Sequence, residues 1–153
     1  MPDDGVALGF DYGKRRVGIA VGSHVTGSAR PLTTLEHRAG MPDWAALDAL
    51  MAEWQPTALV VGLPLNAAGE TQKMTNRARN FSEEIWGRYR VTVHTVDERY
   101  TTIEAGERLR TARATGSRGK RIAKGDIDAM AAQTILESWL TGQLDSAPAG
   151  DHR

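Results

Sequence analysis

An acidic residue stands inside an apolar, strand-like run close to the N-terminus. The run LGFDYG spans residues 8–13 and places Asp11 between Phe10 and Tyr12. A carboxylate is poorly tolerated in such a run unless it is paired or binds a metal. Asp is also common at the start of a hairpin turn, where its side chain hydrogen-bonds nearby backbone. Taken alone, Asp11 is therefore either a metal ligand or a turn residue.

A second acidic pair follows the alternating run VTVHTV at 91–96. Strand alternation directs one of Asp97 and Glu98 toward a cleft and the other away from it. A strand-end carboxylate that faces a cleft is a suitable ligand for a hard cation. A plain helix entry capped by Thr101 or Thr102 is the alternative. Spacing alone does not decide between the two acids.

A third pair, Asp126 and Asp128, opens an apolar helical pattern. Ala132, Ile135 and Trp139 follow Asp128 by 4, 7 and 11 residues, so Asp128 shares their largely apolar helix face. An acid in the first turn also offsets the helix dipole, which contributes about 0.3–1 kcal/mol. Asp126 can take that capping role, and because residues i and i+2 do not share a face, Asp128 is left to point toward something positive.

Carboxylates from two strand regions and a helix suggest a site for hard divalent ions. Such ions prefer carboxylate oxygen and water, and two of them about 4 Å apart can activate a water and stabilise a phosphodiester leaving oxygen. The chain has no Cys, and its 4 His are scattered without a Ser-His-Asp pattern. His94, on the alternating strand, is interpreted as a structural residue. The residue types favour metal-dependent cleavage of phosphodiesters.

The net charge is zero, but the charges are segregated along the chain. Residues 1–72 hold 5 Lys and Arg against 8 Asp and Glu, residues 73–124 hold 13 against 6, and residues 125–153 hold 1 against 5. The stretch 108–124 is basic throughout, with Arg108, Arg110, Arg113, Arg118, Lys120, Arg121 and Lys124 and no acid. This segregation is typical of a surface that binds a phosphate backbone, although a solvated basic loop has the same composition.

Length and composition predict one soluble, cytoplasmic domain. The chain has 153 residues, 41% of them hydrophobic, and lacks any run of the roughly 20 apolar residues that cross a membrane. Its acidic start lacks the order of a signal peptide. We expect one domain over residues 1–142 and a disordered tail over residues 143–153.

The expected elements alternate between strands and helices. Strands are predicted at 6–12, 16–22, 30–35, 58–62 and 91–96, and helices at 44–54, 70–86, 102–111 and 127–140. The first two strands form a hairpin across Gly13, Lys14 and Arg15. The order indicates an α/β fold with a mixed sheet, antiparallel strands first and parallel strands after, and helices on its faces. Ligands gather at the carboxyl ends of parallel strands, where residues 97–98 are expected.

Four blocks of the sequence resemble the YqgF/RuvX-type family, described as pre-16S rRNA nucleases or Holliday junction resolvases. They are GFDYGKRRVGIAVG at 9–22, VVGLPLNAAGE at 60–70, VDERYTT at 96–102 and KGDIDAMAAQTILESWL at 124–140. The resemblance implies a ribonuclease H-like fold similar to RuvC, with Asp11, Glu98 and Asp128 as catalytic residues and metal ligands. It thereby selects Glu98 over Asp97 and Asp128 over Asp126. Tyr100 stands where the family more often has Leu.

The resemblance also implies a function and its partners. We expect a nuclease that uses Mg²⁺ or Mn²⁺ to process the 5′ end of precursor 16S rRNA during ribosome biogenesis, with precursor rRNA or a ribosomal precursor particle as partner. A Holliday junction resolvase acting on branched DNA and a non-catalytic RNA-binding assembly factor are the alternatives. No membrane partner is expected. No nucleotide cofactor is expected either, since 153 residues cannot supply the second lobe with which an actin-like ATPase encloses its nucleotide.

Basic residues near the expected site are candidates for substrate binding. Lys14 and Arg15 at the hairpin tip can reach a phosphate, and Arg99 can pair with a carboxylate or a phosphate oxygen. The remaining candidates lie in the basic stretch: Arg118, Lys120, Arg121 and Lys124. Ordinary surface charge is the alternative for all of them. Gly9, Gly13 and Gly18 are interpreted as requirements of the hairpin backbone.

Overall fold

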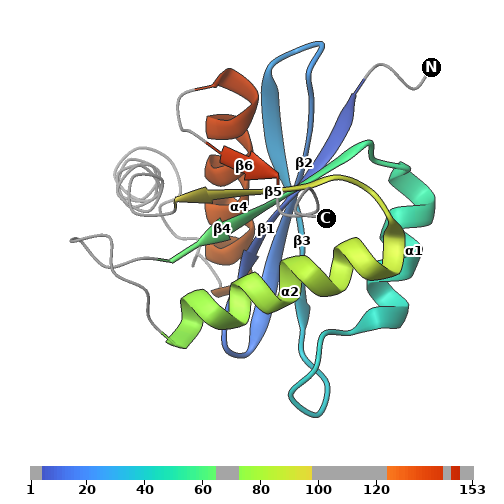
Figure 1. Ribbon diagram of the computed structural model, residues 1–153, viewed down its shortest axis with the longest axis vertical. Helices are drawn as coiled ribbons and strands as arrows, with labels where there is room; N and C mark the ends of the chain where they lie inside the picture. The colour runs from blue at the N-terminus through green and yellow to red at the C-terminus, as the bar shows by residue number, and fades with distance from the viewer. Residues whose placement is uncertain (1–4, 65–72, 98–123, 143–145, 149–153) are drawn as a thin grey trace, which may run out of the picture.

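A single mixed sheet organises the part of the chain that the computed structural model describes, residues 5–64, 73–97, 124–142 and 146–148. Six strands from these residues lie in the order β3-β2-β1-β4-β5-β6 (Figure 1). The strands are β1 Val6–Tyr12, β2 Arg16–Ser23, β3 Ser28–Glu36, β4 Ala58–Leu63, β5 Val93–Asp97 and β6 Ser146–Pro148. The helices are α1 Trp44–Trp54, α2 Lys73–Tyr89 and α4 Lys124–Thr141.

The strand directions confirm the predicted mixed sheet. β1, β2 and β3 form an antiparallel meander, with Asp11 opposite Gly18 in the first pair. β4 pairs in parallel with β1 on one side and with β5 on the other. Every residue of β4 is buried, as expected for a strand covered on both faces. β3 forms an edge of the sheet, which is where a strand tolerates a residue such as Pro31.

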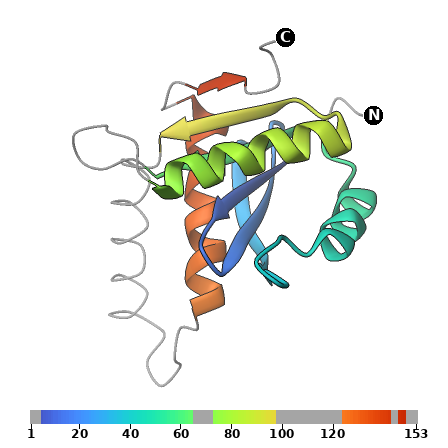
Figure 2. The same ribbon diagram turned by 60° about the horizontal axis from the view of Figure 1, so that its bottom comes forward.

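Helices cover the two faces of the sheet differently. α4 lies behind the sheet in Figure 1, and α1 and α2 lie on the other side, an arrangement that Figure 2 also shows. The core under α1 and α2 contains large side chains such as Leu8, Phe10 and Ile19. The core under α4 takes Ala7 and Ala20 from the same two strands. Alternate residues of β1 and β2 thus supply two cores of different bulk.

The α1 helix begins and ends as its sequence predicts. The side chain of Asp43 accepts a hydrogen bond from the Ala46 backbone N–H at 3.2 Å, which caps the helix and lowers the pKa of that carboxyl. Gln55 ends the helix in the left-handed region, with φ of 46°, directly before Pro56.

A polar link joins α1 to α2 at the surface. The Arg88 guanidinium donates to both carboxylate oxygens of Asp48, at 2.9 and 2.7 Å, and the Tyr89 hydroxyl donates to Asp48 Oδ1 at 2.6 Å. These donors, Arg88 foremost, lower the pKa of Asp48 from 3.8 to about 2. Burial, with the hydrogen bond to Asp48 next, raises the pKa of Tyr89. The link therefore requires Asp48 to be ionised.

The helical period predicts that α2 buries the stripe Met74, Ala78, Phe81 and Ile85, and the observed buried face differs from it. Ala78, Phe81 and Ile85 are buried, but Met74 is only partly buried and Thr75 is completely buried beside it. The Thr75 hydroxyl donates to the Pro64 carbonyl oxygen, which satisfies its polar group in the core. α2 also continues to Tyr89, three residues past the predicted end at Trp86.

Two features at the C-terminal end depart from expectation. α4 already includes Lys124, so Asp126 lies within the helix, and Asp128 is its fifth described residue and not a first-turn cap. Residues 146–148, within the segment expected to be a disordered tail, form β6 and pair antiparallel with β5. The helix predicted at 102–111 and the basic loop lie outside the described residues.

Candidate active site

Asp11 lies at the carboxyl end of β1, at the sheet edge where three parallel strands end. Phe10 pairs with Val61 of β4, and Leu63 of β4 pairs with Asp97 of β5. The last residues of β1, β4 and β5 therefore form one row. Asp11 therefore lies at the same edge as the residues that end β5.

The side chain of Asp11 is directed to the face that α4 covers. On β1, Ala7 belongs to the core under α4, and a Cβ on Gly9 would come within 2.7 Å of the Leu136 Cβ. Strand residues two apart point to the same face, so Asp11 follows Ala7 and Gly9 onto that side. The intervening residues Leu8 and Phe10 belong to the opposite core.

Gly18 brings the backbone of Asp128 against the strand pair that contains Asp11. A Cβ on Gly18 would overlap the carbonyl group of Asp128 and would lie 2.8 Å from the Ala129 backbone nitrogen. Gly18 is the cross-strand partner of Asp11, and such partners have Cα atoms about 4.5–5.5 Å apart. The structure therefore brings Asp11 and Asp128, two of the three predicted ligands, to one place on one face.

This contact corrects the interpretation of Gly9 and Gly18. We expected both glycines to serve the backbone of the hairpin. Instead, the space beside Gly9 is filled by Leu136, and the space beside Gly18 is filled by the backbone of α4. Gly13 does serve the turn, where its N–H donates to the Arg16 carbonyl oxygen at 2.8 Å. The first two glycines are required for helix packing.

Arg16 lies beside Asp128, an interaction that was not predicted from the sequence. Its guanidinium Nη1 lies 3.9 Å from Asp128 Oδ2, and its Nη2 lies 3.9 Å from Glu36 Oε2. The side chains of Arg16 and Asp128 are 23% and 28% exposed, so solvent screens the pair only in part. Arg16 is two residues before Gly18 in β2, so strand alternation places both on the face that α4 covers. The pairing of Arg16 with Asp128 depends in addition on the position of α4.

The other predicted site residues divide into two groups. Lys14 and Arg15 are exposed at the turn between β1 and β2, next to the edge where Asp11 lies. Most of the remaining predicted residues lie outside the described residues: Glu98, Arg99, Arg118, Lys120 and Arg121. Lys124 begins α4, but its side chain is not described. Within the described ranges, no group of three His, Cys, Asp or Glu residues could hold a metal ion. Glu98, the third predicted ligand, comes directly after Asp97, the last residue of β5.

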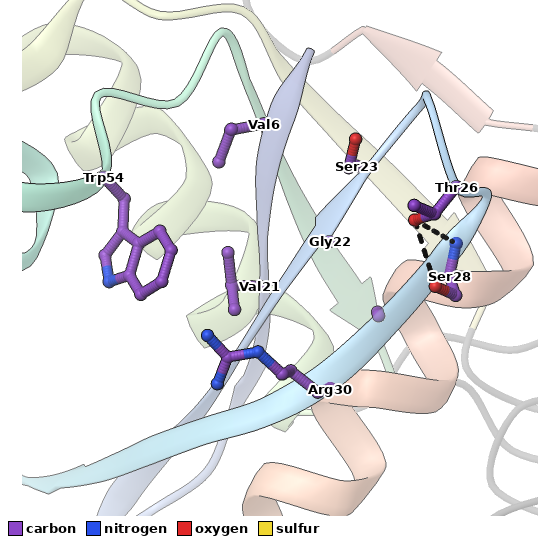
Figure 3. A pocket seen from close by; sticks show the side chains of 9 residues that line it. Val6, Val21, Gly22, Ser23, Thr26, Ser28, Arg30 and Trp54 are labelled. Carbon is purple, nitrogen blue, oxygen red and sulfur yellow. Dashed lines mark hydrogen bonds between the residues drawn. The ribbon is translucent and has the colours of Figure 1, made fainter. Parts of the chain in front are cut away.

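A cavity of about 270 Å³ lies at the opposite end of the same strands (Figure 3). Val6, Val21 and Trp54 contribute to its lining, and the Arg30 guanidinium lies 5.5 Å from the centre of the Trp54 ring. Val6 and Tyr12 are the two ends of β1, about 20 Å apart at the rise of a strand. This cavity is therefore separate from the carboxylate pair.

Residues 5–142 match a protein family described as "RuvX: Holliday junction resolvase". A protein of Pseudomonas putida is 47% identical over 141 residues, 92% of this chain and 97% of that protein. A protein of Nitrosococcus oceani is 47% identical over 138 residues, 90% of this chain and 88% of that protein. Both carry the name "Putative pre-16S rRNA nuclease".

Solved structures show the same fold at low sequence identity. "T. thermophilus RuvC in complex with Holliday junction substrate" aligns with a TM-score of 0.59 at 17% identity, covering 94% of this chain and 99% of that chain. The structure of a yeast mitochondrial Holliday junction resolvase aligns with a TM-score of 0.51 at 12% identity, covering 92% of this chain and 79% of that chain.

The mixed sheet and its structural neighbours define an α/β protein of ribonuclease H-like fold, as predicted. The family match and the identity to curated relatives show that the chain belongs to the RuvX family, a family of nucleases. The resemblance identified from four sequence blocks is confirmed. In the described residues, none of the helices is both long and apolar enough to cross a membrane.

Proposed function

We propose that this protein is a metal-dependent nuclease that processes the 5′ end of precursor 16S rRNA in the cytoplasm. The proposed nuclease domain comprises residues 1–142. The observation that carries the proposal is the convergence of Asp11 and Asp128 on one face through the contact at Gly18. The substrate follows the name shared by relatives that are 47% identical over about nine-tenths of the chain. Precursor rRNA, free or in a ribosomal precursor particle, is the proposed partner.

The donor chemistry of the site fits a hard divalent ion. Asp11 and Asp128 offer carboxylate oxygens, the ligands that Mg²⁺ and Mn²⁺ prefer. We propose Glu98 as the third ligand because it directly follows β5, and because Val96, two residues earlier, belongs to the core under α4. When bound, Mg²⁺ or Mn²⁺ would supply a Lewis acid for phosphodiester hydrolysis.

The protein's own residues orient the carboxylates and attract the substrate. The Arg16 guanidinium lies 3.9 Å from the Asp128 carboxylate and limits its orientation. The backbone contact at Gly18 fixes the distance between β2 and α4, and so between Asp11 and Asp128. Lys14 and Arg15, exposed at the same edge, are proposed to bind phosphate groups of the substrate. Arg99, Arg118, Lys120, Arg121 and Lys124 are proposed as further phosphate contacts.

Cleavage by single carboxamide variants tests the proposal. Asp11→Asn and Asp128→Asn should each abolish Mn²⁺- or Mg²⁺-dependent cleavage of a precursor 5′-end RNA while leaving binding in place. Asp126→Asn is the matched control, because it changes an acid two residues away in the same helix and should retain cleavage. Cleavage that persists in Asp11→Asn, or that needs no metal, would contradict the assignment. RNA binding without cleavage by the wild-type protein in either metal would support the assembly-factor alternative.

A four-way DNA junction is the second candidate substrate. The family description and the RuvC neighbour solved with a Holliday junction both favour it. The same three variants incubated with such a junction distinguish the two nucleases. Junction cleavage that requires Asp11, with no cleavage of the precursor RNA, would replace rRNA processing by junction resolution and leave the carboxylate assignment unchanged.

A further inference from the structure

A cavity of about 450 Å³ opens beside the candidate active site, on the opposite face of the sheet. Tyr12 lines it and follows Asp11 directly, so their Cα atoms are about 3.8 Å apart while their side chains point to opposite faces. The described lining comes from the β1–β2 hairpin, the segment before α1, and α2: Tyr12, Lys14, Gly40, Met41, Pro42, Arg77, Asn80, Phe81 and Glu84.

Stacked rings form the rigid wall of this cavity. The rings of Tyr12 and Phe81 stack with centroids 4.7 Å apart, and the His37 ring lies 5.0 Å from Tyr12 on a tilted plane. His37 is held in turn by a 2.9 Å hydrogen bond between its Nε2 and the Gly13 carbonyl oxygen. The Tyr12 hydroxyl adds a hydrogen-bond donor and acceptor to this wall.

The rim of the cavity carries polar groups available to a ligand. Lys14, Arg77 and Asn80 are exposed. Within the described part of the chain, neither Lys14 nor Arg77 forms an ion pair, and the Asn80 amide forms no hydrogen bond. Among the described lining residues, these two cations outnumber the one acid, Glu84. Met41, 51% exposed, and the buried Pro42 are apolar residues of the same lining.

We propose that this cavity binds one unpaired nucleotide of the nucleic acid strand, next to the bond that is cleaved at Asp11. This inference rests on the proposed nuclease function. Lys14 and Arg77 would contact a phosphate, Met41 would contact the base or sugar, and the Tyr12 hydroxyl and the Asn80 amide would hydrogen-bond a base edge. The volume lies within the roughly 300–1,000 Å³ range of small-ligand sites, which admits a nucleotide but not a base-paired duplex.

Metal-free binding of a fluorescent single-stranded oligoribonucleotide tests the inference separately from cleavage. Arg77→Ala should weaken binding about 5- to 10-fold and reduce the slope of log K against log salt by about 0.7, the value for one lost phosphate contact on a single strand. Asn80→Ala should weaken binding roughly 3-fold with no change in slope. Arg79→Ala and Asn76→Ala are matched controls, since both residues are exposed on α2 and neither lines the cavity, and they should change binding less than 2-fold.

Two results would overturn the inference. One is equal binding by Arg77→Ala and Arg79→Ala, with equal salt slopes. The other is that Arg77→Ala and Asn80→Ala weaken the binding of a fully paired duplex, which has no single-stranded nucleotides, as much as they weaken the binding of the single strand. Thermal unfolding of each variant verifies that it is folded. Binding is measured without metal, so its result does not depend on cleavage. If the protein binds the single strand as expected but does not cleave RNA when metal is added, the cavity assignment is retained and only the nuclease assignment is lost.

Discussion

The two faces of the sheet use the same strands but depend on different kinds of packing. On the α1 and α2 side, β1 and β2 present Leu8, Phe10, Val17 and Ile19 to a core of large side chains. On the α4 side, the alternate positions hold Ala7, Gly9, Gly18 and Ala20. The first core can adjust by changing side-chain rotamers. The second has backbone against backbone at Gly18, where no rotamer change can create space.

The proposed metal site lies on the less adaptable face. Asp11 and Asp128 both belong to the α4 side, so their separation is set by a main-chain contact and not by the volume of intervening side chains. Carboxylates that share a metal ion have to be held within about 0.5 Å of the productive geometry. A backbone contact provides that precision. We therefore expect one methyl group to have unequal effects on the two faces.

The largest effect is expected for Gly18→Ala, which adds one methyl group on the α4 side. The new Cβ would overlap the Asp128 carbonyl group, so α4 has to move away from β2. We expect a loss of about 3 kcal/mol in the free energy of unfolding, measured by urea denaturation, and loss of metal-dependent cleavage. Gly87→Ala in α2 is the control, because nothing lies within 4 Å of its Cβ position and Ala favours a helix. An active, fully stable Gly18→Ala protein would refute the backbone-contact account.

A smaller effect is expected for Ile19→Val, which removes one methyl group from the adjacent residue on the other face. Ile19 is completely buried in the core of large side chains. Its truncation should cost about 0.5–1.5 kcal/mol in urea denaturation. Cleavage by the folded protein should be unchanged, because α1 and α2 do not position the carboxylates. A loss of cleavage comparable to that of Gly18→Ala would remove the distinction between the faces.

The smallest effect is expected at acid pH, from the surface link on the α1 and α2 side. The pKa of Asp48 is about 2 in the folded protein against an ordinary value of 3.8, so its contribution to stability is complete above about pH 4 and is lost as the pH falls through 2. Asp48→Asn should therefore lower the urea midpoint near pH 6 and leave it nearly unchanged near pH 2. Because the group is exposed, the difference is expected to be small and to decrease with salt. A constant difference at both pH values would contradict this origin.

Sequence patterns indicated candidates where chemistry and periodicity coincide at one residue. Asp11 stood out by its charge in an apolar run, which does form a strand, and Asp128 by its position on an apolar helix face that does pack on the sheet. Arg16 was missed because its pairing with Asp128 depends on how far α4 approaches β2, which no local pattern encodes. Similarly, Thr75 replaces Met74 in the core because Pro64, a distant residue, accepts its hydrogen bond. Tertiary partners decide such positions.

The three-residue strand β6 has a consequence for self-association. It pairs with β5 on the side away from β4, and so occupies backbone groups at the end of the sheet. Unpaired backbone at a sheet edge is a template for strands of other molecules, and proteins often protect such edges with short strands or proline. β3, at the other end, contains Pro31. Both ends of the sheet are thus protected against edge-to-edge aggregation, by a short strand on one side and by a missing N–H donor on the other.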